Sequence, residues 1–230
     1  MCFTPLVSIS TAIIEFILAT VLLLSFPNRI LRNFSAILIY LLGFYQFTEF
    51  MLCVSNSPIL WARVGIITYT LLPAIALHST FKFVNKKPNY FVIYILPLIF
   101  EIIAFCSPIV TNATCQTFFV VVHSAFNQSN TSLNSFLSFM YMVYYFGFIL
   151  ANCLLFYVYL KSPKNKLKRK IGVVEISGVL LMTVPTVLLL IIFPFLGEVF
   201  PSMLCGFAVF VAVALFIAVY LETKINKRGI

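Results

Sequence analysis

The most regular feature of this sequence is the recurrence of long apolar stretches separated by short polar segments. A helix that crosses a membrane needs about 20 mostly apolar residues. Seven stretches come close to or exceed that length, and they cover residues 5–26, 34–54, 59–81, 89–108, 134–160, 172–196 and 200–221. We therefore predict an all-α membrane protein, a seven-transmembrane helix bundle formed by a single domain over residues 1–230.

The composition favours a membrane protein over a soluble one. Hydrophobic residues make up 62% of the chain and charged residues 9%, whereas soluble domains average about 45–50% and about 25%. The mean hydropathy is +1.09. The first stretch has no basic segment before it and contains Glu15, so we expect a span rather than a cleaved signal peptide. With the spans in place, we expect no room for a soluble catalytic domain.

The positions of the cations predict the orientation of the helices. Of the 15 Lys and Arg residues, all except Arg63 lie after the first, third, fifth or seventh stretch. Cytoplasmic segments of membrane proteins contain the excess of Lys and Arg. We therefore predict a multi-pass plasma membrane protein with its N-terminus outside and its C-terminus in the cytoplasm. These clusters explain the net charge of +9, so we expect the lipid bilayer, and no nucleic acid, as a partner.

The longest predicted outer loop covers residues 109–133. It contains three Asn-x-Ser/Thr triplets, which begin at Asn112, Asn127 and Asn130. These are glycosylation acceptors in a eukaryotic secretory context, or chance products of an Asn-, Ser- and Thr-rich loop. Residues 117–122 are rich in β-branched and aromatic side chains, which predicts a short hairpin over the bundle.

Most of the cysteines map to the predicted outer side, where oxidising conditions permit disulfides. They are Cys2, Cys53, Cys106, Cys115 and Cys205. We predict a disulfide between Cys115 and either Cys53 or Cys106. The alternative is that these residues are small apolar fillers near helix ends.

Several ionisable residues lie inside predicted spans, where charges are costly and usually face the bundle interior. Glu15 lies near the middle of the first span, and the others share a depth in the outer leaflet: Glu49, Arg63 and Glu101. A short loop joins spans 2 and 3, so a Glu49–Arg63 ion pair is expected, with Gln46 one turn away on the same face. These residues predict either an outward-facing polar pocket that binds a ligand or a buried pair that fixes helix packing.

His78 lies near the inner end of the third span. It is a candidate proton-sensitive switch, or a histidine packed against its neighbours. The sequence has two distant histidines, no Asp and no clustered Cys/His motif, so we expect no metal site. The prolines inside the spans, Pro73, Pro97 and Pro185, predict helix kinks.

The known enzyme motifs that a sequence can reveal are missing. There is no nucleophile elbow, no paired-histidine motif and no phosphate-binding loop, so we expect neither enzymatic activity nor a cofactor. Lys224 lies beyond the last span, which excludes a retinal-binding pump. The characteristic motifs of G-protein-coupled receptors in the third and seventh helices are also absent.

One region resembles a known family. It reads Gly43-Phe-Tyr-Gln-Phe-Thr-Glu49, then Leu60-Trp-Ala-Arg63-Val-Gly65, then Leu71-Leu-Pro73 and His78. This pattern, between Gly43 and Val84, is similar to the seven-helix N-terminal membrane sensor region of bacterial histidine kinases and diguanylate cyclases. The resemblance covers about a fifth of the chain.

The resemblance implies a receptor-like membrane sensor whose outer pocket, for a small ligand or lipid, involves Glu49 and Arg63. No kinase or cyclase domain precedes Ile230, so a separate cytoplasmic signalling partner is expected. The basic segment 161–170 is a candidate docking site for an acidic partner or anionic lipid, or simply a determinant of topology. The alternative function is a small transporter or channel that uses Glu15, Glu49 and Glu101 as cation or proton sites.

Overall fold

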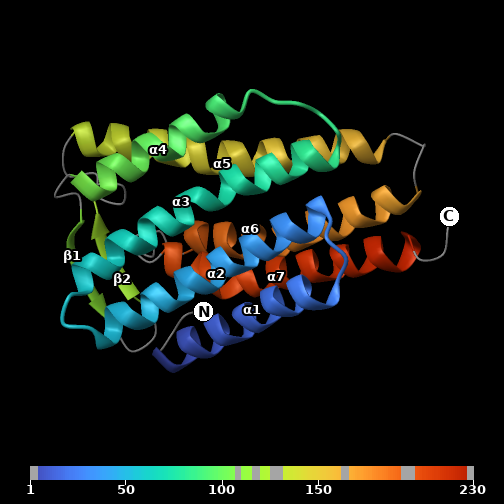
Figure 1. Cartoon of the computed structure of the whole chain (residues 1–230). Coiled ribbons are helices and arrows are strands. Elements are labelled where there is room, and N and C mark those ends of the chain that lie inside the picture. Colours follow the sequence, from blue (N-terminus) through green and yellow to red (C-terminus); the bar gives the residue numbers. More distant parts are fainter. Residues whose placement is uncertain are drawn as a thin grey trace.

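The computed structural model describes residues 5–106, 110–115, 120–124, 132–161, 166–192 and 200–226. These residues form seven helices and one two-stranded hairpin (Figure 1). In chain order the elements are α1 (Pro5–Ser25), α2 (Ile30–Val54), α3 (Pro58–Phe83), α4 (Tyr90–Cys106), β1 (Val110–Cys115), β2 (Val120–Ser124), α5 (Ser132–Leu160), α6 (Lys166–Ile192) and α7 (Phe200–Asn226).

The structure confirms the predicted bundle of apolar helices. Six of the described helices are long and apolar enough to cross a membrane, while α4, with 17 residues, is shorter. At 1.5 Å per residue, α4 is about 25 Å long, close to the lower limit for a span. Pro73, Pro97 and Pro185 lie inside α3, α4 and α6 as predicted.

One predicted boundary is wrong. The sixth predicted span begins at residue 172, but α6 begins at Lys166, inside the basic segment 161–170, and residues 162–165 lie outside the described part. The helix starts earlier than the apolar stretch because Lys, Leu and Arg are good helix formers. The first turns of α6 therefore extend the bundle beyond its apolar region.

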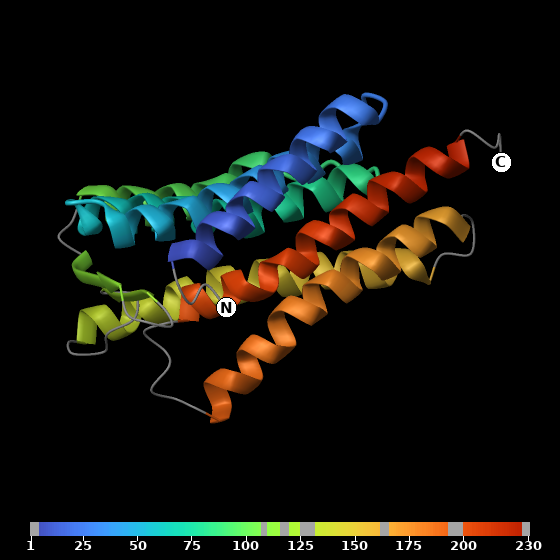
Figure 2. The same ribbon diagram turned by 90° about the horizontal axis from the view of Figure 1, so that it is seen from below.

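The helices pack around α2 and α3. The α2 helix contacts α1, α3 and α7, and α3 contacts α2, α4 and α5. The last helix, α7, packs against α6 and also returns to α1 and α2, so the bundle closes around an interior. Figure 2 shows α6 inclined to the other helices, with its C-terminal end splayed away from them.

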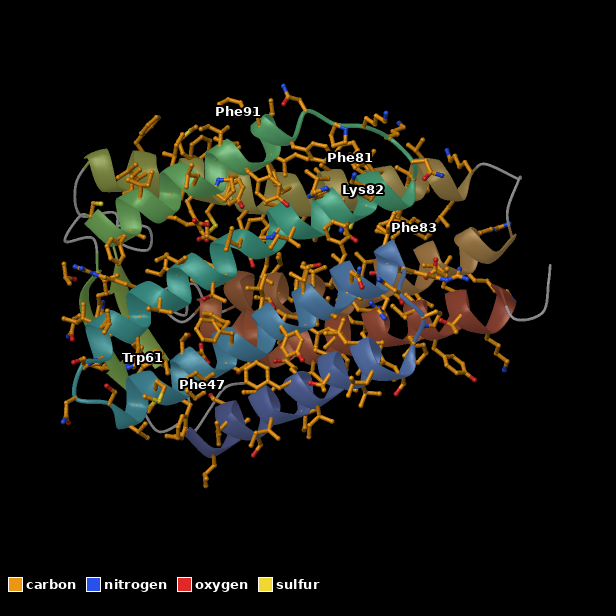
Figure 3. The ribbon with its side chains drawn as sticks, in the orientation of Figure 1. Phe47, Trp61, Phe81, Lys82, Phe83 and Phe91 are labelled. Atoms are coloured by element: carbon orange, nitrogen blue, oxygen red, sulfur yellow. A yellow bond between two sulfur atoms is a disulfide. The ribbon has the colours of Figure 1, made fainter. Side chains whose placement is uncertain are left out.

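The N-terminal and C-terminal ends of α3 differ in chemistry (Figure 3). Near its N-terminus, the ring of Trp61 packs edge-on against Phe47 of α2, with 5.9 Å between the ring centroids. Near its C-terminus, the ammonium of Lys82 lies 5.2 Å from the centre of the Tyr90 ring. Asn85 lies two residues after the helix and has a φ of 58°. The backbone N–H groups of Asn85 and Lys86 donate hydrogen bonds back to the carbonyls of Lys82 and Phe81. This is the Schellman arrangement, in which Asn replaces the usual Gly.

The hairpin covers one end of the bundle, as the sequence predicted. Strands β1 and β2 pair antiparallel, with an irregularity between Val110 and Asn112. Val110, Ala113 and Val120 are buried against a core cluster that includes side chains of α2 and α3. The hairpin begins earlier than the predicted 117–122, because β1 already starts at Val110, and Val110 and Ala113 are its buried residues. Asn112 is exposed on β1, and Asn127 and Asn130 lie outside the described residues.

Candidate functional site

A disulfide joins the hairpin to the helices. Cys53, near the end of α2, is bonded to Cys115 at the end of β1, with 5.1 Å between their Cα atoms. This is one of the two predicted pairings, and it places the hairpin directly over α2. Cys106 is a free, exposed cysteine. Cys2 and the side chain of Cys205 lie outside the part of the chain described here.

Glu49 and Gln46 are buried inside the bundle. Gln46 is fully buried and Glu49 is 4% exposed. The hydroxyl of Tyr45, one turn earlier on α2, donates a hydrogen bond of 3.0 Å to Glu49 Oε1. The predicted burial of these two groups is therefore confirmed, and Tyr45 is a partner that the sequence analysis did not identify.

The predicted Glu49–Arg63 ion pair does not form. Among the described residues, the ion pair found is Arg29–Glu222, at 3.9 Å, and the buried Nε of Arg63 has no hydrogen-bond partner. The reason is the rotation of α3. A Cβ at Gly65 would lie 2.9 Å from Thr48 Oγ1, so Gly65 faces α2. Arg63 is two residues away, about 200° around the helix, and therefore points away from α2.

Glu15 occupies a different interface. It is fully buried on α1, and neither carboxylate oxygen has a hydrogen-bond partner. A Cβ at Gly43 would lie 3.2 Å from the Cβ of Glu15, so the absence of a side chain at Gly43 allows α1 and α2 to approach here. Glu15 is thus at the α1–α2 contact.

Glu101, on α4, is half-buried and has one oxygen without a partner. Within the described residues, no hydrogen bond or ion pair joins any two of the four predicted charged residues. The side chains of Glu15, Glu49, Arg63 and Glu101 are on four different helices. Among the described residues, no direct contact between charged side chains therefore supports the predicted polar pocket.

The described helices line a partly open apolar cavity in the bundle. Its volume is about 90 Å³, and α2, α3, α5, α6 and α7 all contribute to its walls. On α2 and α3 it is lined by Leu38, Leu42, Tyr45, Tyr69, Leu72, Pro73 and Ala76; on the other helices by Tyr145, Phe148, Ile149, Asn152, Val179, Met182, Ala208 and Val211. None of the four predicted charged residues lines this cavity.

Polar groups are placed at both ends of the cavity wall. The rings of Tyr45 and Tyr145 both pack against Tyr69, with centroid distances of 5.5 Å and 6.2 Å. On α3, one turn after Ala76 of the cavity wall, the hydroxyl of Thr80 donates a hydrogen bond to Asn152 Oδ1. The cavity therefore has an apolar middle between a tyrosine cluster and an amide.

His78 is packed among aromatic rings, as the second of its two predicted roles requires. Its Nδ1 lies 2.8 Å from the hydroxyl of Tyr94, and its ring is close to those of Phe34 and Tyr90, at 4.9 Å and 4.6 Å. A switch function for this histidine is still a prediction.

Within the described residues, no group of three or more His, Cys, Asp and Glu is placed to hold a metal ion.

Glu175 was missed by the sequence analysis, although it lies within a predicted span. It is 8% exposed, and one carboxylate oxygen has no partner. On α6, Gly172 faces Leu160 of α5 and Gly178 faces Ala214 of α7. Around the helix, Glu175 lies between Gly172 and Gly178, so its side chain points into the interior. It is one turn before Val179, which lines the cavity. The signal that identified Glu15, an acid within an apolar stretch, would also have found it.

The sequence and the fold were compared with known proteins. No family model, no curated protein and no solved structure matches this chain.

Proposed function

We propose that the chain is a receptor-like membrane sensor that binds the apolar part of a small molecule or lipid in its central cavity. The observation that supports this is the cavity itself, which five helices share. A ligand there contacts both halves of the chain at once. A change in its occupancy would therefore alter the packing of α6 and α7 against α2 and α3.

The size of the cavity limits the ligand. A cavity of about 150 Å³ in another protein holds benzene and stays dry without it. At about 90 Å³, this cavity fits a smaller apolar group, such as the end of an alkyl chain. The polar side chains in the cavity wall are Tyr45, Tyr69, Tyr145 and Asn152, and the polar part of such a molecule would lie next to them.

The region that resembles the bacterial sensors contributes to the cavity. Tyr45 and Pro73 line it, and Gly65 allows α3 to pack closely against Tyr45 and Thr48. In this proposal, the resemblance reflects cavity formation and helix packing rather than a Glu49–Arg63 pocket. Glu49 supports the cavity wall by accepting the hydrogen bond from Tyr45.

We also propose seven spans in a plasma membrane, with the hairpin outside and the basic helix ends in the cytoplasm. Arg29, Lys82, Lys161 and Lys224 lie at or beyond helix ends on the side opposite the hairpin, as the positive-inside rule requires. The Cys53–Cys115 bond fits an oxidising exterior. A separate cytoplasmic protein would read the signal at the basic ends, including 161–170.

Filling the cavity tests the proposal. Ala208 is 2% exposed and lines the cavity, so Ala208→Leu should occupy its volume. We expect small apolar compounds with short alkyl groups to raise the melting temperature of the purified wild-type protein. Ala208→Leu should melt cooperatively but lose this response. If no such compound stabilises the wild type, or if the variant responds equally, the sensor proposal is wrong.

A transporter or channel is the second candidate, favoured by the buried acids without partners. Glu15 and Glu175 are both at least nine-tenths buried with unpartnered oxygens, and isolated acids at membrane depth often mark proton or cation pathways. Glu49 and Glu101 would belong to the same pathway. Proton or cation flux into proteoliposomes that stops on Glu175→Gln would favour transport over sensing.

A further inference from the structure

An open groove lies between the inner ends of α6 and α7, away from the central cavity. Its volume is about 520 Å³. Two cations, Arg169 and Lys170, and three apolar side chains, Val173, Val174 and Leu221, form its lining. The groove therefore combines a positively charged end with an apolar wall.

The two parts of the lining lie at different depths along the helix. Arg169 and Lys170 are in the first turns of α6 and are exposed. Val173 and Val174 follow three to five residues later, which places them about 5–7 Å further along the axis. Moving along α6 from its basic start, the groove changes from charged to apolar in the direction of the membrane.

The two cations are available for a ligand. Glu222 is next to Leu221 on α7, but its carboxylate is paired with Arg29 at 3.9 Å. In the part of the chain that the structure describes, neither Arg169 nor Lys170 takes part in an ion pair. Within the described residues, no ion pair therefore neutralises the charge at this end of the groove.

We propose that this groove binds an anionic phospholipid. The phosphate would interact with Arg169 and Lys170, and an acyl chain would lie along Val173, Val174 and Leu221. Basic pockets at the cytoplasmic ends of helices bind anionic headgroups in this way. An acidic peptide would match the two cations but would leave the apolar wall without an apolar partner.

A matched pair of variants tests the site. Arg169→Gln with Lys170→Gln removes two charges from the groove, while Lys86→Gln with Lys87→Gln removes two exposed charges from the α3–α4 connection, outside the groove. The probes are phosphatidylglycerol and phosphatidylcholine, titrated onto purified protein and counted by native mass spectrometry. Wild-type protein should prefer phosphatidylglycerol. The groove variant should bind it roughly 30-fold less tightly, since each cation near a membrane surface contributes about 1 kcal/mol.

The control variant should stay within about twofold of wild type. Val173→Phe, which narrows the groove without changing its charge, should also weaken phosphatidylglycerol binding and leave the melting temperature near that of wild type. Equal binding of the two lipids, or equal losses in the groove and control variants, would overturn the proposal. So would displacement of the lipid by inorganic phosphate or by a poly-glutamate peptide, since neither contacts the apolar wall.

Discussion

Gly178 of α6 and Ala214 of α7 are in such close contact that a Cβ added at Gly178 would lie 2.4 Å from the Cβ of Ala214. The same atom would lie 3.4 Å from the backbone oxygen of Phe210. Helices in a membrane associate mainly through close packing, and small residues at the contact allow their backbones to approach. This contact therefore fixes how α6 and α7 pack beside the cavity.

We expect Gly178→Ala to destabilise the protein. Overpacking usually costs about 1–3 kcal/mol, which exceeds the gain of up to about 1 kcal/mol in helix propensity. The melting temperature of the detergent-purified protein should fall, and adding Ala214→Gly should restore part of the loss. Gly147→Ala is the control, because no atom lies within 4 Å of its added Cβ, and it should be neutral or slightly stabilising. A higher melting temperature for Gly178→Ala would contradict the contact.

Loss of the Cys53–Cys115 bond should also lower stability. It closes a loop with a sequence separation of 62 residues, and bonds of this kind typically contribute about 2–4 kcal/mol. We expect Cys53→Ser with Cys115→Ser to melt at a lower temperature and to lose the dependence of wild-type melting on reductant. Cys106→Ser should leave both unchanged, because Cys106 is exposed and unbonded. Retention of the reductant effect in the double variant would mean that another pairing is present.

Replacing Glu15 by an apolar residue should stabilise the protein if its role is only structural. Both oxygens of Glu15 are buried without partners, and such polar groups typically cost about 1–3 kcal/mol in proteins. Glu15→Leu should therefore raise the melting temperature. Glu222→Gln is the comparison, since it loosens a partly exposed pair with Arg29 and should lower stability by about 1 kcal/mol or less. A large loss of stability for Glu15→Leu would indicate that the carboxylate has a ligand or cation in the native membrane.

The double-mutant cycle between Glu49 and Arg63 should show no coupling. Glu49 accepts a hydrogen bond from Tyr45, and Arg63 points away from α2. The effects of Glu49→Ala and Arg63→Ala on unfolding free energy should add to within about 0.5 kcal/mol. A second double-mutant cycle, between Glu49 and Tyr45, should instead show a favourable interaction energy, because these two side chains share a hydrogen bond. Strong coupling between Glu49 and Arg63 would mean that α3 is rotated in the membrane relative to this structure.

Cysteine labelling can establish the orientation. In a background with Cys2, Cys106, Cys153 and Cys205 replaced by Ser, Asn112→Cys places an exposed thiol on β1, and Lys86→Cys places one on the α3–α4 connection. A membrane-impermeant maleimide added to intact cells should label position 112 and label position 86 only after lysis. The same result at both positions would mean that the number of spans differs from seven.

The sequence by itself determined the helices and their approximate ends. An apolar stretch in a bilayer must satisfy its own backbone hydrogen bonds, so a helix is the one open solution for a single segment. It also located the hairpin and narrowed the disulfide to two pairings, because both depend on local composition and on which ends of the spans lie together. The burial of Glu15 and Glu49 followed from the same reasoning.

Only the tertiary structure decided how each helix is rotated and which residues meet. Gly65, rather than Arg63, faces α2 because the helices approach most closely where a side chain is absent. Cys115 reaches Cys53 rather than Cys106 because β1 crosses the end of α2. The cavity depends on residues from five helices that are far apart in the chain. No local pattern encodes it, since an apolar residue facing a cavity and one facing lipid look the same in a sequence.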